Sequence, residues 1–254
     1  MSVAVGERDP LVRLLGWRAL LLHGDPVAFD RWLWVRHKLA PGPVATLDAG
    51  TGNGAFAMYA ATRGNDVTGV SDFPPSLAKA ERRARMSGLE RVSFRALDLR
   101  QLDRHAGELG PYDQVLCFEV IEHILDDRKL LRDLATVIRP GGRLMITTPY
   151  LHHIPYFDEH VSEVEDGGHV RVGYTHEQMD ALLADAGFRV ASRDYLSGAV
   201  SQALNNLMQR GNHLAPHLGW AATFPLRVLR PLDRPLTKLR RRPYLSIAVE
   251  AVRE

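Results

Sequence analysis

The stretch Leu47-Asp48-Ala49-Gly50-Thr51-Gly52-Asn53-Gly54 decides the fold, and it follows a short apolar run that starts at Val44. Glycines at alternate positions permit a tight turn and a close approach of the backbone to a ligand. A helical stretch from Ala55 to about Thr62 comes directly afterwards, and the N-terminus of a helix offers free N–H groups. Alone, the loop is also compatible with a plain turn or with a dinucleotide-binding site.

Strands and helices alternate along the rest of the chain. Predicted strands cover residues 44–48, 66–70, 92–97, 114–118, 143–147, 188–192 and 245–252. Predicted helices cover residues 8–38, 55–62, 75–86, 126–138 and 175–186, the last with Thr175 as its N-cap. This order predicts an α/β fold with a doubly wound, mostly parallel seven-stranded sheet, N-terminal helices and a helical late insertion. Ligands of such sheets bind beyond the carboxyl ends of the strands.

The composition excludes several classes of protein. The chain has 254 residues and a single Cys, which rules out a disulfide framework and any multi-cysteine zinc or iron–sulfur site. A net charge of +2 gives no whole-protein case for nucleic acid or membrane. The most apolar N-terminal stretch, Leu11–Leu22, contains Arg13 and Arg18 and is too short to span a bilayer. We therefore expect a cytoplasmic protein, either free or peripheral to a membrane.

Five segments in a fixed order resemble those of the class I S-adenosylmethionine-dependent methyltransferases. They are the D-x-G-x-G-x-G loop and residues 67–72, 97–99, 112–124 and 138–144. The dinucleotide fingerprint fits less well, because the third glycine falls one residue early. The resemblance covers roughly residues 44–192. It implies a Rossmann-like methyltransferase fold and S-adenosylmethionine as the methyl donor.

The resemblance also implies which residues hold that donor: Asp48, Gly50, Gly52, Gly54, Asp72, Asp98, Leu99 and Phe118. The family places an acid after the second strand to hold the ribose hydroxyls. That position is Ser71 here, and Asp72 stands one residue later. Asp98 and Leu99 match the acid and apolar neighbour at the adenine edge, whereas Phe118 matches the residue at the methionine end.

Glu119, Glu122 and His123 have the i, i+3, i+4 spacing that places three side chains on one face of a helical turn. Their E-x-x-E-H segment resembles the metal-binding segment of small-RNA 2′-O-methyltransferases and of the O-methyltransferases of ubiquinone synthesis. In the RNA enzymes a later histidine completes the set, and His169 stands close to that place. The resemblance thus implies a divalent cation, Mg²⁺ or Mn²⁺, on these four residues. Nitrogen ligands favour Mn²⁺, Fe²⁺, Co²⁺ or Zn²⁺ over Mg²⁺.

The alternative is that the segment binds no metal and His123 merely packs and hydrogen-bonds. Six of the 11 histidines lie within residues 123–176, which favours a polar site there. Acids are interleaved with them: Asp158, Glu159, Glu163, Glu165 and Asp166. Without a metal, the general base would be His123, His152 or His153.

The flanking regions are expected to choose the substrate. Residues 1–40 predict an N-terminal helical cap, either a lid or extra core, and residues 41–254 the methyltransferase domain. Within that domain, residues 149–174 would form a His- and acid-rich active-site loop and residues 195–243 a substrate-side insertion. Residues 227–242 hold seven Lys/Arg and one acid in an amphipathic pattern, although prolines argue against one continuous helix. Arg227–Arg242 would therefore contact an anionic membrane, a phosphate or an acidic partner, or else form a solvated face.

We predict an S-adenosylmethionine-dependent methyltransferase that acts on an oxygen nucleophile. The expected acceptor is a hydroxyl of a glycan, lipid-linked or secondary-metabolite intermediate. RNA 2′-O-methylation is the first alternative, although no RNA-binding module is recognisable. N- and C-methylation stay open because the fold suits both, and a donor-binding module without catalysis is the alternative from a different class.

Overall fold

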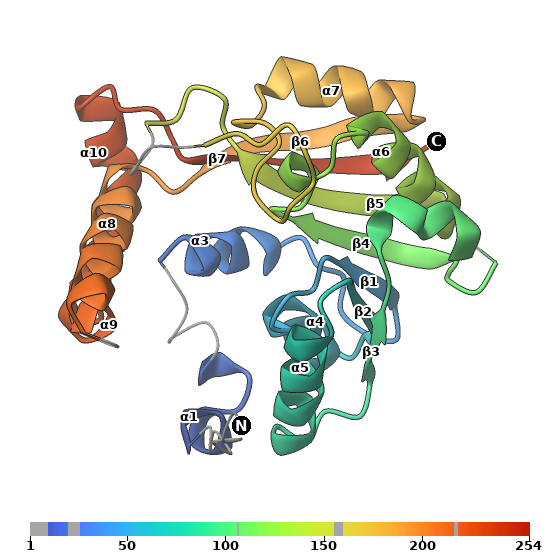
Figure 1. Ribbon diagram of the computed structural model, residues 1–254, viewed down its shortest axis with the longest axis horizontal. Coiled ribbons are helices and arrows are strands. Elements are labelled where there is room, and N and C mark those ends of the chain that lie inside the picture. Colours follow the sequence, from blue (N-terminus) through green and yellow to red (C-terminus); the bar gives the residue numbers. More distant parts are fainter. Residues whose placement is uncertain (1–9, 20–25, 106, 155–159, 216–217) are drawn as a thin grey trace.

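The computed structural model describes residues 10–19, 26–105, 107–154, 160–215 and 218–254. Its centre is a seven-stranded sheet in the order β3-β2-β1-β4-β5-β7-β6 (Figure 1). The strands are β1 Ala45–Ala49, β2 Asp66–Ser71, β3 Val92–Ala96, β4 Tyr112–Phe118, β5 Ile138–Pro149, β6 Phe188–Leu196 and β7 Ser246–Arg253. Neighbouring strands from β3 to β5 are parallel, whereas β7 runs antiparallel to both β5 and β6. The predicted doubly wound, mostly parallel α/β fold is thus confirmed.

Helices follow most of the strands, as the alternation predicts. The α-helices that come before the last part of the chain are α1 Pro10–Leu15, α3 Pro26–Val35, α4 Ala55–Thr62, α5 Pro74–Met86, α6 Asp127–Val137 and α7 His176–Asp185. Two 3₁₀ turns, η1 Leu99–His105 and η2 Ile121–His123, follow β3 and β4. Thr175 caps α7 in a capping box with Gln178, which confirms the predicted N-cap.

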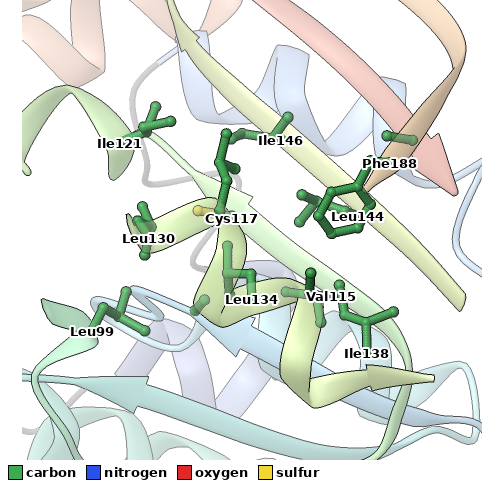
Figure 2. Packing of buried hydrophobic residues seen from close by; sticks show 14 of the residues in the cluster. Leu99, Val115, Cys117, Ile121, Leu130, Leu134, Ile138, Leu144, Ile146 and Phe188 are labelled. Carbon is green, nitrogen blue, oxygen red and sulfur yellow. The ribbon is translucent and has the colours of Figure 1, made fainter. Parts of the chain in front are cut away.

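The two faces of the sheet are covered by different helices. Along β4, Val115 and Cys117 point into the core formed with α6 and α7, which Figure 2 shows from close by. The alternate residue Leu116 packs into the second core, together with side chains of α3 and α4. Trp17 and Trp34 are buried in this second core. Trp17 and Trp34 therefore act as core, one of the two roles expected for residues 1–40.

Several predicted boundaries differ from the structure. Residues 8–38 are not helical throughout, because α1 ends before Gly16, whose φ is 58°, and α3 ends at Val35. Strand β6 continues past residue 192 to Leu196.

The fifth strand is predicted over residues 143–147, directly after the Pro-Gly-Gly turn at residues 140–142, but β5 already begins at Ile138. Ile138 pairs with Tyr112, and the register shifts before Gln114 meets Arg143. The Pro-Gly-Gly turn is therefore an irregularity inside a longer strand.

The late insertion forms a helical group beside β6 and β7. Helices α8 Ala199–Leu214, α9 Leu218–Thr223 and α10 Asp233–Leu239 lie together with the 3₁₀ segment η3 Pro225–Leu232 at one end of the molecule (Figure 1). Pro231 lies inside η3, and the basic segment is split between η3 and α10, as its prolines indicate. In the described ranges, no helix combines the length and the apolar character needed to cross a membrane.

Candidate functional site

A cleft of about 580 Å³ lies at the carboxyl ends of β1, β2 and β4. Chain order reverses between β1 and β4, so these ends diverge and leave a crevice. Gly50 and Gly52 of the glycine loop and Asp72 after β2 line it. Further lining comes from the segments after β3 and β4 and from the loop after β5: residues 97–100, 119–120, 123–124 and 165–167.

The three glycines of the loop have different roles. All three have positive φ values, of 80° at Gly50, 50° at Gly52 and 80° at Gly54. A Cβ atom at Gly50 would lie 2.3 Å from Val120 Cγ2, and one at Gly54 would lie 2.8 Å from Ala80 Cβ. A Cβ atom at Gly52 would meet no atom of the described residues within 4 Å. Gly50 and Gly54 therefore allow close packing of the protein, whereas Gly52 leaves the cleft open to a ligand.

Asp48 supports the loop from behind. Its buried carboxylate accepts hydrogen bonds from Thr51 Oγ1 at 2.6 Å and from the Ala57 N–H at 3.0 Å. It thus ties the end of β1 to the loop and to the first turn of α4. Burial raises the pKa of Asp48 to about 6, although both hydrogen bonds act in the opposite direction.

Asp72 and Asp98, the two acids predicted to hold the nucleoside end of the donor, both line the cleft, as does Leu99. The Arg100 guanidinium lies between these acids, with nitrogens 2.7 Å from Asp98 Oδ1 and 3.7 Å from Asp72 Oδ2. Its hydrogen bond lowers the pKa of Asp98. Arg100 also binds Glu165 at 3.0 Å, which links the acids to the loop after β5.

Phe118 lies outside the described lining of the cleft, although the resemblance places the donor's methionine end beside it. Its buried ring meets Phe56 edge-on with centroids 4.9 Å apart and Trp34 with centroids 6.1 Å apart. The end of β4 is therefore braced by aromatic side chains from α3 and α4. Phe118 contributes to the cleft through this support.

Next to the cleft, Glu122, His123 and His169 each bring one potential ligand atom within 4.8 Å of the others. Glu122 is fully buried, and its Oε2 accepts a hydrogen bond from Thr148 Oγ1 at 3.1 Å. Its Oε1 is buried without a hydrogen-bond partner among the described residues. Burial, and then the charge of Glu119, raise the pKa of Glu122 well above its ordinary value. The buried acid therefore has one oxygen available to a cation or a proton.

The two histidines of this group face each other. Their rings meet edge-on with centroids 4.7 Å apart. His123 Nδ1 lies 2.9 Å from the Gly168 carbonyl oxygen, so the loop after β5 holds its ring in place. His123 also lines the cleft. It is thus the residue that belongs both to the cleft and to the group of potential metal ligands.

The expected helical turn over residues 119–123 is not formed. Glu119 has a φ of 53°, and only Ile121–His123 form a short 3₁₀ turn. Glu119 consequently lies outside the group, where its Oε1 accepts a hydrogen bond from Thr147 Oγ1 at 2.9 Å and lies 3.6 Å from Arg31 Nε. It remains in the lining of the cleft.

The other two candidate bases lie after β5. His153 Nδ1 is 2.7 Å from the Tyr150 carbonyl oxygen, and the His152 ring meets the Tyr150 ring edge-on at 5.3 Å. Neither belongs to the described lining of the cleft, in contrast to His123. Asp158 and Glu159 lie outside the described residues.

The sequence family of the methyltransferase domain matches residues 43–203, more than half of the chain. The chain belongs to the class I S-adenosylmethionine-dependent methyltransferases. The ubiquinone biosynthesis O-methyltransferase of Marinobacter nauticus is 35% identical over 107 residues, which are 40% of this chain and 42% of that protein. The enzyme of the same name from Methylocella silvestris is 35% identical over 116 residues, 44% of each chain. The methyltransferase thus spans less than half the length of these curated relatives.

Solved structures share the fold at lower identity. The [4+2]-cyclase SpnF is 21% identical with a TM-score of 0.62, over 88% of this chain and 80% of that chain. Phosphoethanolamine N-methyltransferase 2 of Haemonchus contortus, in complex with S-adenosyl-L-methionine, is 19% identical with a TM-score of 0.62, over 97% and 58%. At such identities the likeness concerns the fold alone.

Several residues around the methyltransferase cleft were not predicted, among them Arg100, Glu165 and Arg31. Arg100 could have been found from its place two residues after Asp98, where its backbone N–H donates to Asp98 Oδ1 at 3.0 Å. Glu165 lies in the noted acid-rich stretch, but only the folded loop shows that it meets Arg100. Arg31 gave no signal, because nothing in the sequence brings α3 to the end of β4.

Proposed function

We propose that this methyltransferase binds S-adenosylmethionine in the cleft and transfers the methyl group to a hydroxyl oxygen of its acceptor. Gly52 leaves room for the backbone to approach the donor, and Asp72 and Asp98 offer carboxylates to ribose hydroxyls and to the adenine amino group. Methyl transfer is an in-line displacement at an activated carbon. The protein must therefore position the oxygen and take its proton.

The observation that supports an oxygen nucleophile is the group of Glu122, His123 and His169 beside the cleft. A divalent cation fits this group, because the buried Glu122 Oε1 has no hydrogen-bond partner among the described residues and the group adds two imidazoles. When bound, such an ion lowers the pKa of a hydroxyl and fixes the position of its oxygen. Thr148 and the Gly168 carbonyl hold the ligands in place. Glu119 is not needed as a ligand in this arrangement.

When no cation is bound, proton removal is assigned to His123. It alone of His123, His152 and His153 lines the cleft in the described part of the chain. Its Nδ1 faces the Gly168 carbonyl, which favours the tautomer with hydrogen on Nδ1 and leaves Nε2 with its lone pair. A neutral imidazole in that state can either accept the hydroxyl proton or bind a metal ion, but one nitrogen cannot do both at once.

The acceptor is proposed to be a glycan, a lipid-linked molecule or a secondary-metabolite intermediate. The curated relatives are named O-methyltransferases, which supports an oxygen acceptor. A second cavity of about 770 Å³ lies between α3 and the late insertion, with aromatic side chains of Phe29, Trp34 and Tyr195 in its lining. Helix α3 borders both sites, since Trp34 contacts Phe118 and Arg31 faces Glu119. Residues 195–243 would thus form the substrate side, and residues 1–40 a cap built on α3.

RNA 2′-O-methylation is the second candidate, because it would use the same Glu/His group and could use the arginines of the insertion. N- or C-methylation would need no metal ion at this group. A donor-binding module without catalysis would bind S-adenosylmethionine and leave a hydroxyl acceptor unchanged.

Calorimetry tests the donor and the metal separately. We expect saturable binding of S-adenosylmethionine, and no binding at millimolar donor would refute the proposed function. Mn²⁺ should bind to the full chain, and Glu122→Gln or His169→Gln should weaken it at least roughly tenfold by removing one ligand. His160→Gln is the matched control, since this exposed histidine of the same loop lies outside the group. Equal Mn²⁺ affinity in all four proteins would remove the metal from the account.

A further inference from the structure

Positive charge is concentrated in the late insertion. Residues 195–249 contain eight Lys/Arg and a single acid, Asp233, whereas the remainder of the chain has 24 Lys/Arg and 29 Asp/Glu. Asp233 is directed inward, where it accepts hydrogen bonds from the N–H groups of Gly198 at 2.8 Å, Val200 at 2.7 Å and Ser201 at 3.0 Å. Its charge is therefore used to cap α8 and does not offset the basic side chains outside.

Large apolar side chains are exposed on the same insertion. Among the described residues, sixteen large hydrophobic side chains are exposed, and nine of them lie between residues 207 and 239. The relative exposure reaches 76% at Val228, 79% at Leu239 and 82% at Leu214. None of the eight residues of η3 is buried. Monomeric proteins rarely leave so many apolar side chains of one segment in water without a partner.

Polar contacts of three of its arginines hold the conformation of the insertion. Arg230 pairs with the buried Asp30 of α3, and Arg234 nitrogen Nη2 lies 2.9 and 3.0 Å from the two Asp194 carboxylate oxygens. Arg242 donates to Gln202 at 2.9 Å. The remaining basic side chains of α10 and its C-terminal end are exposed: Lys238, Arg240 and Arg241. Leu239 lies between Lys238 and Arg240 in the chain, so basic and apolar side chains are exposed next to one another.

We propose that this insertion surface, formed by η3, α10 and residues 240–242, docks on a lipid bilayer that contains anionic lipids. Exposed leucine and valine side chains can enter the boundary between headgroups and acyl chains, while arginines and lysines meet the phosphates. Anionic lipid supplies the negative charge that the insertion itself lacks. A second copy of the chain would bring the same surplus of positive charge, so pairing of two insertions is disfavoured.

Docking there would place the second cavity at the membrane. Arg227, Val228, Pro231 and Arg234 belong both to the insertion surface and to the lining of that cavity. An amphiphilic molecule could therefore pass from the bilayer toward α3 without crossing open water. This last point rests on the proposed function, whereas the docking itself does not.

Vesicle co-sedimentation tests the proposal on the full chain without donor or acceptor, so that failure of docking and failure of methyl transfer are separate results. We expect binding to vesicles of phosphatidylcholine with phosphatidylglycerol, and little binding to phosphatidylcholine alone. Lys238→Gln/Arg240→Gln/Arg241→Gln should reduce the partition coefficient by about fivefold for each charge removed. The matched control is Arg82→Gln/Arg85→Gln/Arg104→Gln, which removes the same charge from exposed positions elsewhere.

The apolar part of the surface has its own variant. Val228→Gln/Leu239→Gln should also weaken vesicle binding at least roughly tenfold, because each removes apolar area that would leave water. Leu14→Gln, at an exposure of 79% on α1, is the control. Absence of wild-type binding to the anionic vesicles would overturn the proposal, as would equal binding by the insertion variants and their controls. Sedimentation velocity could instead show that the unmodified protein is a dimer, that the insertion variants are monomers and the control variants dimers, and that no protein binds vesicles. That result would assign the surface to a second copy of the chain.

Discussion

Replacing Gly52 by Ala separates the role of this glycine in donor binding from its role in folding. Gly52 has a φ of 50°, and in the part of the chain that the structure describes the added Cβ would meet no atom within 4 Å, so the methyl group enters the open cleft. The left-handed backbone costs a residue with a Cβ about 1–2 kcal/mol. Since no clash is added, this cost is the whole expected loss of stability. For a chain of this size it lowers the melting temperature by roughly 2–8 °C.

Gly88 provides a matched control. Its φ is 66°, and a Cβ there also meets no described residue within 4 Å. It follows the end of α5, outside the described lining of the cleft. Gly88→Ala should therefore destabilise the protein about as much as Gly52→Ala. The two variants should differ in one property only, the affinity for S-adenosylmethionine.

Calorimetry and urea unfolding measure the two effects. We expect Gly52→Ala to weaken S-adenosylmethionine at least roughly tenfold, which corresponds to about 1.4 kcal/mol, because the methyl group occupies space that the donor needs. Gly88→Ala should leave the affinity unchanged. If both variants bind the donor as tightly as the unmodified protein, the donor does not approach Gly52 and the assignment of the cleft is wrong.

Three further predictions concern the charges. The pKa of Asp48 is raised from 3.8 to about 6, so Asp48 should contribute a fall of up to about 3 kcal/mol in the free energy of unfolding of the ligand-free protein as pH rises from about 4 to about 6. The difference in that free energy between the unmodified protein and Asp48→Asn should therefore change by this amount across the range in urea unfolding, and a constant difference would contradict the raised pKa. Arg230→Met should lower the free energy of unfolding by about 3–5 kcal/mol, because Asp30 is left charged and buried. Asp30→Asn/Arg230→Met should lose clearly less, and equal losses would mean that the pair is not coupled. Arg100→Gln should raise the pKa of Asp98, which the Arg100 hydrogen bond lowers, and an unchanged carboxyl titration by NMR would contradict that contact.

Local signals were sufficient to predict the architecture of the sheet. Apolar runs and helix caps such as Thr175 act within a few residues, and each appears directly in the sequence. The boundary of β5 was missed because its first residues pair with β4 before a register shift, and no local pattern reports such pairing. Long-range pairing therefore set the limit on predicting the fold.

The sequence predicts the residues of the candidate site that directly follow a strand. It does not predict the contacts that residues from distant segments make with them. Asp72 and Asp98 follow β2 and β3, so their place at the cleft is a consequence of the topology. Glu119 was grouped with Glu122 on the assumption of a helical turn, but its φ of 53° turns its carboxylate toward Thr147 and Arg31. A positive φ at a non-glycine residue cannot be read from spacing alone.

Product identification with an isotope-labelled methyl donor tests the central claim most directly. The full chain is incubated with methyl-labelled S-adenosylmethionine and fractionated cell extract, and the labelled product is identified by mass spectrometry and NMR. We predict that the label appears as an O-methyl group on a glycan, lipid-linked or secondary-metabolite hydroxyl, and that Gly52→Ala lowers its yield at subsaturating donor while Gly88→Ala does not. A label on nitrogen, on carbon or in short RNA, or no label that depends on the protein, would contradict the account.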